Sequence, residues 1–259
     1  MPRKPRIYCS SGIYHIVLRS VNQQLIFEED LDYLKFLFVL SDCKEKYGID
    51  IYAYCLMGNH IHLLLHSPQE ALAGFFQSLG ARFVRWYNKK YQRTGHLFQE
   101  RYHSFAVEST DYYLNTLIYI HNNPVKAGVC RFPSEYRWSS YCTFYGQKNA
   151  LIDVAFSENL VGSRQFLQQY FADHEMDDPA SHGIKEEENA EPKHLFTDTE
   201  VQEILKKLAD TSSINAARML NKTERNKLIS ALHATGVTFK QISRLLGISV
   251  ITVQRICKK

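Results

Sequence analysis

Two histidines stand out as residues that could perform chemistry. His60 and His62 are separated by one residue in the apolar run 60–66, HIHLLLH. Alternate residues of a strand share a face, so both imidazoles would lie on one side with Cβ atoms roughly 7 Å apart, and both could bind one metal ion. The simpler interpretation is two core or surface histidines that alternate by chance. The apolar strand, which directly follows a Gly-Asn turn, favours a metal site, whereas His66 lies too far along to join it.

The residue types narrow the choice of metal. A site made only of imidazoles would suit zinc or another transition metal. Two imidazoles joined by an amide oxygen and by phosphate oxygens would suit Mn²⁺ or Mg²⁺, because Mg²⁺ prefers oxygen ligands and substrate phosphates. We therefore expect a divalent metal ion, Mg²⁺ or Mn²⁺.

A tyrosine on a helix supplies the second chemical group. In the helical segment 110–123, Tyr112, Asn115, Tyr119 and Asn123 form a polar stripe at helical spacing. A phenol with a pKa of ~10 is a poor nucleophile at neutral pH. A metal ion that polarises a phosphodiester lowers this demand, and a tyrosine can then form a covalent phosphodiester. The chain has 16 tyrosines. Without the histidine pair, Tyr119 would be interpreted as a structural tyrosine at the edge of a core.

The elements that must position these groups alternate along the first half of the chain. Hydrophobic periodicity and turn signals predict strands and helices in the order β-α-β-β-α-β, followed by one more helix that Pro124 is expected to end. This order predicts an α+β fold with a ferredoxin-like antiparallel sheet. The expected strands are 13–19, 50–56, 60–66 and 101–107, and the expected helices are 29–47, 69–91 and 110–123.

Composition divides the chain further. Residues 1–145 form the expected first domain, and residues 146–172 a helical extension. Residues 173–194 are expected to form an acidic linker, since residues 173–191 hold eight acids and one lysine. Residues 195–259 are expected to be an all-α region.

The helix 69–91 and its exit combine cations with aromatic rings. Such a combination is expected where single-stranded nucleic acid binds, because cations contact phosphates and aromatics stack on bases. A solvated basic face on an amphipathic helix is an equally good interpretation. The candidate DNA-binding residues are Arg82, Arg85, Lys89, Lys90, Arg93 and Arg101.

The end of the chain predicts a helix-turn-helix over about 225–259. Residues 213–259 hold nine basic residues and one acid, a formal charge of +8. Two short helices, 239–246 and 250–257, flank the turn 247–249, and the second would enter the major groove of double-stranded DNA. The alternative is a helical dimerisation hairpin. The candidate DNA-contacting residues are Ser249, Thr252, Gln254 and Arg255.

Composition also restricts the cellular setting. The 259 residues contain 45% hydrophobic and 22% charged residues, which is typical of a globular protein. No apolar run approaches the ~18 residues of a membrane span, and the amino-terminal segment lacks a signal-peptide pattern. Six scattered cysteines form no C-x-x-C pair. We expect a cytoplasmic, nucleoid-associated protein without a membrane partner.

Four segments in order, YCLMGNHIHLLL, GHLFQERYHSFAV, YIHNNPVKAGV and YRWSSY, carry a family resemblance. Over roughly its first 145 residues the chain resembles the insertion-sequence-200-like single-tyrosine transposases of the HUH endonuclease superfamily, especially the REP-associated branch. The resemblance implies His60 and His62 as metal ligands and Tyr119 as the nucleophile. Asn123, the further expected ligand, stands where glutamine is common in simpler relatives, and Gly58 where proline is frequent.

The resemblance also implies a reaction. Single-stranded or hairpin DNA would be cut and rejoined while the tyrosine holds the 5′ phosphate and leaves a free 3′ hydroxyl. In relatives the active site can be shared across a dimer, so a homodimer is left open. The expected function is a metal-dependent single-strand DNA endonuclease and strand transferase. The alternatives are a DNA-binding regulator with a retained but unused nuclease site, and a replication-initiator or relaxase-like nickase.

Overall fold

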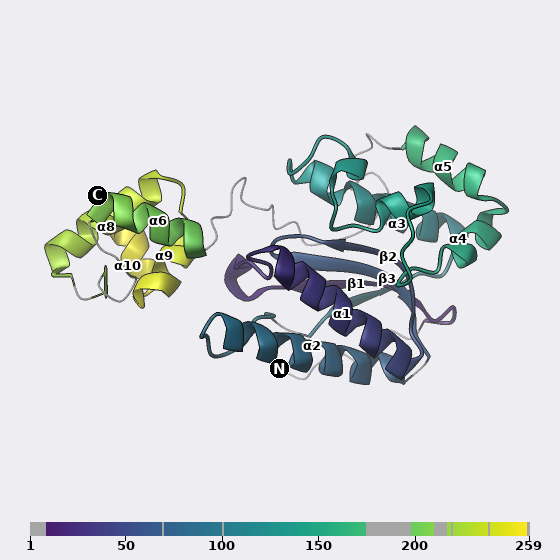
Figure 1. Ribbon diagram of the computed structural model, residues 1–259, viewed down its shortest axis with the longest axis horizontal. Coiled ribbons are helices and arrows are strands. Elements are labelled where there is room, and N and C mark those ends of the chain that lie inside the picture. Colours follow the sequence, from purple (N-terminus) through teal and green to yellow (C-terminus); the bar gives the residue numbers. More distant parts are fainter. Residues whose placement is uncertain are drawn as a thin grey trace. The chain divides into compact units, whose positions relative to one another are not determined.

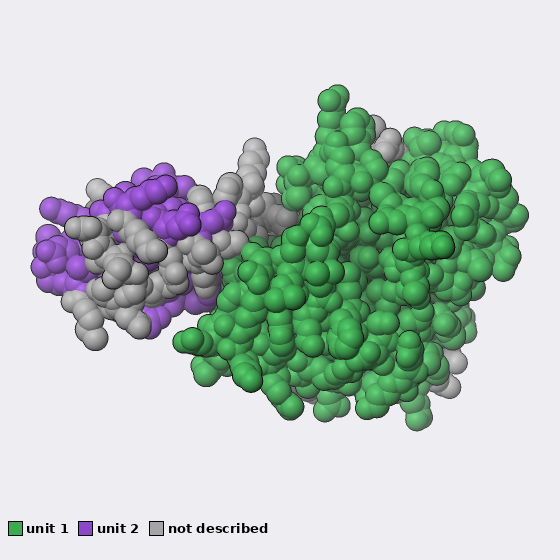
Figure 2. All heavy atoms as spheres, in the orientation of Figure 1, with its two compact units in different colours: residues 1–190 green, residues 191–259 purple. Residues whose placement is uncertain are grey.

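The computed structural model describes residues 9–68, 70–99, 101–174, 198–209, 217–218, 220–237 and 239–257. Its contacts divide the chain into two compact units, residues 1–190 and residues 191–259 (Figure 2). Each unit buries apolar side chains of its own. Most of the expected acidic linker, 173–194, lies outside the described residues.

Four antiparallel strands form the sheet of the first unit. They are β1 (Ile13–Arg19), β2 (Asp50–Leu56), β3 (His60–His66) and β4 (His103–Ala106), and their order in the sheet is β2-β3-β1-β4. The predicted α+β class with an antiparallel sheet is confirmed. The first three strands have their predicted bounds, and β4 is shorter than the predicted 101–107.

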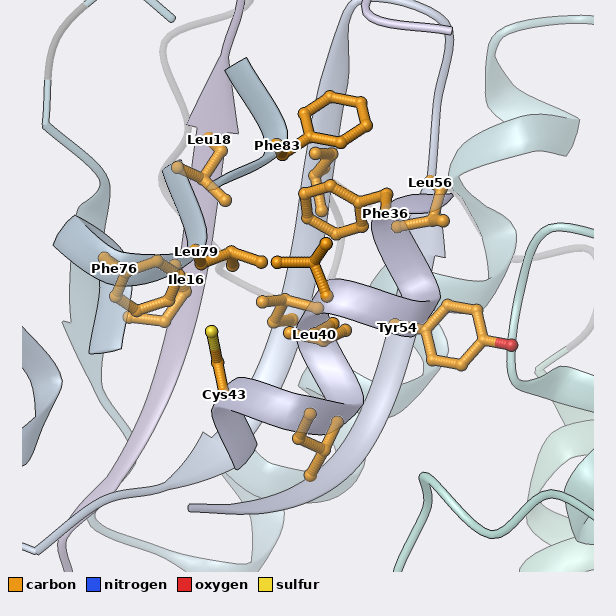
Figure 3. Close-up of a cluster of buried hydrophobic side chains, with 14 of the residues drawn as sticks. Ile16, Leu18, Phe36, Leu40, Cys43, Tyr54, Leu56, Phe76, Leu79 and Phe83 are labelled. Carbon is orange, nitrogen blue, oxygen red and sulfur yellow. The ribbon is translucent and has the colours of Figure 1, made fainter. Parts of the chain in front are cut away.

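Helices cover both faces of this sheet (Figure 1). α1 (Asp30–Tyr47) and α2 (Ala71–Lys90) pack together on one face, and α3 (Thr110–Lys126) lies on the other. Strand alternation explains the division, because successive side chains of β3 enter different cores. Ile61, Leu63 and Leu65 are buried with α1 and α2, whereas Leu64 is buried with α3. Figure 3 shows the first of these cores, where Phe36 and Leu40 of α1 meet aliphatic side chains of α2 and β1.

Side-chain hydrogen bonds fix the start of α1, and a glycine follows its end. Asp32 is fully buried, and its Oδ2 accepts hydrogen bonds from the backbone nitrogens of Glu28 (2.7 Å) and Glu29 (3.0 Å) at the helix start. Gly48 follows the helix at φ +61°, a conformation that glycine adopts without a steric penalty. The hairpin between β2 and β3 closes where the Met57 nitrogen donates to the His60 carbonyl at 2.9 Å.

The prediction that Pro124 ends its helix was wrong. α3 continues through Pro124 to Lys126, and the Ala127 nitrogen still donates to the Asn123 carbonyl at 2.9 Å. A proline this close to the end of a helix removes only one backbone donor, and the following turn keeps its own bonds.

The remaining described segments of the first unit pack against both cores. Short 3-10 helices interrupt its loops: η1 (Val21–Gln23), η2 (Pro133–Glu135) and η3 (Tyr141–Tyr145). α4 (Val154–Val161) and α5 (Arg164–Asp173) follow in the expected helical extension. They bury side chains in the same core as α3, where the Tyr113 hydroxyl lies 2.6 Å from Ser157 Oγ.

The second unit is helical in its described part. Its helices are α6 (Asp198–Ala209), α8 (Lys222–Ala234), α9 (Phe239–Leu246) and α10 (Val250–Cys257). Ile242, Leu245 and Val253 are buried together, with Ile248 and Ile256 packed against them. Ser249 Oγ accepts from the Thr252 nitrogen at 3.2 Å and so caps α10. Within the described residues of both units, no helix combines the length and apolar character needed to cross a membrane.

Candidate functional site

β3 and α3 bring the two expected chemical groups together. His60 and His62 point to the α3 side of the sheet, and their ring centroids are 4.8 Å apart with the planes perpendicular. The Tyr119 ring on α3 lies 5.6 Å from the His62 ring. Tyr119 is 6% exposed, so its ring is part of the core edge while remaining beside the imidazoles.

Asn123 completes this cluster from the next turn of α3. Its Nδ2 donates to the Tyr119 carbonyl at 3.1 Å, which directs Oδ1 toward β3. Asn123 Oδ1 lies 3.4 Å from His60 Nε2. The predicted polar stripe of this helix therefore lies beside the histidine pair at its carboxyl-terminal end, where Tyr119 and Asn123 are found.

Protein groups contact the Nδ1 atom of each imidazole. His60 Nδ1 lies 2.6 Å from Asn59 Oδ1, and His62 Nδ1 lies 3.2 Å from His15 Nε2. His15 is fully buried on β1, and its ring stacks on His62 at 5.4 Å. A histidine that ligates a metal ion typically has its other nitrogen held in this way, which fixes the ring orientation.

The donor atoms fit a divalent metal ion. Because Asn59 Oδ1 is an acceptor, Nδ1 of His60 carries a proton, and a neutral ring then presents a lone pair at Nε2. This lone pair and Asn123 Oδ1 lie 3.4 Å apart. Two ligands at about 2.1 Å from one ion are separated by roughly 3.0–3.4 Å, so a cation between them would satisfy both atoms.

His62 is held in the form that a metal ion requires. Burial lowers its pKa well below the ordinary value, and the charges of His60 and Arg19 lower it further, against a hydrogen bond with Asn123. His62 is therefore neutral at pH 7 and can offer a lone pair. No group of three His, Cys, Asp or Glu side chains in the described parts of the chain could hold a metal ion.

His66 shares this strand face without joining the cluster. Its Nδ1 lies 3.5 Å from Asp50 Oδ2 at the opposite end of β3, and the side chain is 37% exposed. The interpretation of His66 as separate from the metal site agrees with this position.

The basic residues of α2 lie on the other face of the sheet from the histidine pair, because α2 packs with α1. Arg82 pairs with Asp42 of α1 at 2.6 Å. Lys90 contacts buried Asp32, and Arg93 Nη2 donates to Gln24 Oε1. Arg85 and Lys89 are exposed. Three of the expected DNA-binding residues thus make side-chain contacts within the first unit.

Arg101 lies beside a cavity of about 580 Å³ on that face. α2 contributes Phe76, Gln77 and Gly80 to the walls, and the segment before β4 contributes His96 and Phe98 among others. Arg101 itself is exposed. The structure therefore does not bring Arg101 together with Tyr119.

The candidate residues of the second unit cluster on α10 and its cap. Ser249 and Thr252 contact each other through their hydroxyls at 2.8 Å, so both take part in capping. Gln254 and Arg255 are exposed one turn further along.

Sequence reasoning missed two residues on β1. The pairing of β1 with β3 places Arg19 opposite His60 and brings His15 to His62. His15 and Arg19 are polar residues four positions apart in the otherwise apolar strand IYHIVLR, so both lie on the same face. Such a pattern indicates a polar site on that face. The pattern does not show which strand pairs with β1.

A buried histidine two residues after Tyr119 on α3 predicts that the folded protein loses stability in acid. His121 is fully buried, lies 2.9 Å from Ser140 Oγ, and burial lowers its pKa to about 3. The unfolded chain binds this proton near pH 6.5, so the stabilising contribution is complete above that pH and is lost as the pH falls toward 3. We expect the free energy of unfolding to fall by about 1.4 kcal/mol per pH unit across this window from His121 alone.

Urea unfolding at several pH values measures this slope. Trp86 and Trp138 are the two tryptophans of the chain and lie in the first unit, so fluorescence reports that unit. The His121→Phe variant should show a slope shallower by about one proton. An unchanged slope would show that His121 titrates normally in the folded protein.

Comparisons with known proteins match this chain to transposases. Residues 8–123, which include all four residues of the cluster, match the family model described as IS200-like transposase. A candidate REP-associated tyrosine transposase of Haemophilus influenzae is 27% identical over 151 residues, which cover 52% of this chain and 83% of that protein. A solved REP-associated tyrosine transposase, bound to a REP hairpin, superposes with a TM-score of 0.50 at 17% identity, over 60% of this chain and 90% of the other.

Proposed function

Residues 8–123 of this chain belong to the IS200-like transposase family, and on this premise we propose that the first unit cleaves and rejoins single-stranded DNA at hairpin-associated sites. The observation that carries the proposal is the position of Tyr119 beside His62, with Asn123 Oδ1 directed at His60 Nε2. A phenol thus adjoins a set of lone pairs suited to Mg²⁺ or Mn²⁺. The strand order β2-β3-β1-β4 supports the ferredoxin-like assignment.

In the proposed reaction, Tyr119 Oη attacks the scissile phosphorus and its phenolic proton is released. The bond from phosphorus to the 3′ oxygen breaks, and this oxygen leaves as a free 3′ hydroxyl. Tyr119 then holds the 5′ phosphate, and attack by a 3′ hydroxyl reverses the step. His60, His62 and Asn123 would hold the ion, which when bound supplies Lewis-acid stabilisation of the phosphate charge.

An oligonucleotide assay tests this reaction. A hairpin with a single-stranded extension, labelled at its 3′ end, is incubated with the protein and Mn²⁺ or Mg²⁺. The label should remain with the protein in denaturing gels, because the 5′ phosphate of the downstream fragment is attached to tyrosine. A 5′ label on the same oligonucleotide should instead leave with a shortened strand. Absence of cleavage across varied hairpins would favour the DNA-binding regulator over the enzyme.

We also propose that the second unit is a helix-turn-helix module for double-stranded DNA. α9 and α10 flank the turn at Gly247, where φ is +68°, and they share a core with α8. The exposed Gln254 and Arg255 on α10 support a contact with base edges or phosphates. The acidic linker and the domain bounds predicted from composition remain proposals.

Replacing Arg255 tests this module within the full chain. We expect Gln254→Ala with Arg255→Gln to weaken duplex binding about 10-fold or more, since one contact to a base or phosphate contributes about 1–3 kcal/mol. Cleavage of single-stranded hairpin extensions should change little. Arg164→Gln, which removes an exposed cation on α5, is the matched control. Equal duplex binding by all three proteins would rule out α10 as the reading helix.

A further inference from the structure

The cavity of about 580 Å³ between α2 and the segment before β4 lies on the face of the sheet opposite to the histidine pair. Its volume is within the range of ligand-binding sites in proteins, about 300–1,000 Å³. Hydrogen bonds on both sides of Phe98 hold one wall in place. The Leu97 carbonyl accepts from the Val21 nitrogen at 2.9 Å, and the Gln99 nitrogen donates to the Arg19 carbonyl at the same distance. The cavity is therefore formed before a ligand binds.

Gly80 of α2 forms part of the cavity wall, and the described residues around it leave space for a side chain. Apart from its own helical turns, a Cβ atom at Gly80 would meet nothing within 4 Å. Gly74 of the same helix differs, because a Cβ there would lie 2.9 Å from Tyr47 Cε1. A glycine inside a helix is destabilising relative to alanine, and one use of it is the close approach of a ligand to the backbone. Packing thus explains Gly74, whereas a ligand would explain Gly80.

Aromatic and aliphatic side chains form most of the cavity surface. The ring centroids of Phe76 and Tyr102 are 4.2 Å apart, and the half-buried Phe98 also lines the cavity. Such rings stack on nucleobases of any type, because every base has a π-face. Gln77 and His96 add hydrogen-bonding groups at exposed positions. These walls suit a flat heteroaromatic ligand with polar edges.

The charges around the cavity suit a phosphate. Arg101 lines the cavity and is exposed, and none of the described residues that line it is acidic. Arg85 and Lys89 are exposed on α2 and follow Ala81, a lining residue, at intervals of four positions. They therefore continue the helix face that borders the cavity. A nucleotide combines a flat base with a phosphate and so matches both the rings and the cations.

The cavity lies at the same end of the sheet as the histidine pair. Leu18 of β1 lines the cavity and is the Cα partner of Ile61, the residue between His60 and His62 on β3. Successive side chains of a strand point to opposite faces, so the cavity and the histidines lie on different faces of the same strands. A single strand that passes around the edge of the sheet beyond residues 97–99 would reach both.

We propose that this cavity binds one unpaired nucleobase of the DNA strand that the first unit cleaves, with the base against Phe98 and Tyr102 and a neighbouring phosphate at Arg101. This inference rests on the proposed function and extends it to the opposite face of the sheet. The bound nucleotide would set the register in which the strand reaches Tyr119. It would contribute affinity rather than reactivity, because it does not touch the reacting atoms.

Gly80→Leu tests this occupancy, because the leucine fills the cavity without displacing a described neighbour. We expect its free energy of unfolding in urea to equal or exceed that of the parent, since leucine favours the helix. The probe is the hairpin with a single-stranded extension that the parent binds most tightly, measured by fluorescence anisotropy without a metal ion. Its affinity should fall about 5–100-fold, the contribution of one stacked base. Glu45→Leu, at an exposed position of α1, should bind as the parent does.

Abasic oligonucleotides, which lack one base and keep every phosphate, identify the bound nucleotide. One abasic position in the extension should lower the affinity of the parent about 5–100-fold. The same oligonucleotide should lose nothing further with Gly80→Leu, because both changes remove one interaction. Arg101→Gln should weaken binding of every oligonucleotide and reduce the slope of log affinity against log salt concentration by about 0.7.

The outcomes separate the cavity from the transposase chemistry. If the parent forms adducts but Gly80→Leu binds as tightly as the parent, or no abasic position matters, the cavity assignment is wrong and the proposed function stands. The assignment also fails if the losses from the abasic site and from Gly80→Leu add. If the parent shows the abasic effect yet forms no adduct with Mn²⁺, the cavity binds DNA and the proposed cleavage fails. If the parent does not bind the single-stranded extension, both proposals fail.

Discussion

Replacing Tyr119 with phenylalanine is expected to abolish the covalent protein–DNA adduct. The change removes one oxygen atom, the proposed nucleophile, and leaves the ring beside His15 and His62. Loss of a nucleophile typically lowers the rate by at least about 10³-fold. The measurement is the amount of 3′-labelled oligonucleotide retained by the protein in a denaturing gel with Mn²⁺.

Tyr112→Phe is the matched control for this variant. Tyr112 lies on the same stripe of α3, about two turns before Tyr119, and is half-buried. Its replacement should leave adduct formation within about threefold of the parent protein. Adduct formation by Tyr119→Phe at the parent rate would contradict the assignment of the nucleophile. Unchanged Mn²⁺ binding by Tyr119→Phe would show that its metal site is intact.

Replacing His60 with alanine is expected to lower Mn²⁺ affinity by about 100-fold or more and to remove cleavage with it. The imidazole supplies one of two nitrogen ligands, and even the partner residues that orient such ligands contribute about 10–100-fold. His60 is better suited than His62 because it is half-buried, whereas His62 is fully buried and its removal would leave a cavity.

His66→Ala is the control on the same strand face. His66 lies at the other end of β3 beside Asp50, so its loss should change neither Mn²⁺ affinity nor adduct formation. Equal losses in the two variants would indicate that the strand, rather than the ligand, had been disturbed. Full Mn²⁺ affinity in His60→Ala would place the metal site elsewhere.

The fold gives some of the basic residues of α2 a structural role. From the sequence, its cations and aromatics predict a surface for single-stranded DNA. In the structure, Lys90 neutralises the buried carboxylate of Asp32, and Arg82 pairs with Asp42. A change at Lys90 would therefore alter the stability of the unit as well as any contact with DNA. The Arg82–Asp42 pair is exposed and contributes little to stability. Arg85 and Lys89, which are exposed, are the clearer probes of DNA binding by this helix.

Local sequence patterns determined much of this protein. Hydrophobic periodicity and turn signals predict β1, β2 and β3 at their observed bounds, and they predict α1 with only its first residue displaced. The spacing of His60 and His62 places both on one face, and helical periodicity places Asn123 one turn after Tyr119. These features depend on residues close in sequence, so strand and helix geometry suffices to derive them.

The tertiary structure decided how distant segments meet. Strand pairing sets β1 beside β3, which brings His15 to His62 and Arg19 opposite His60. The packing of α3 directs Asn123 Oδ1 at His60, and the sheet separates that site from α2. The sequence pattern specifies which face of each element is apolar but not which neighbour covers it, because that choice depends on the packing of the whole core.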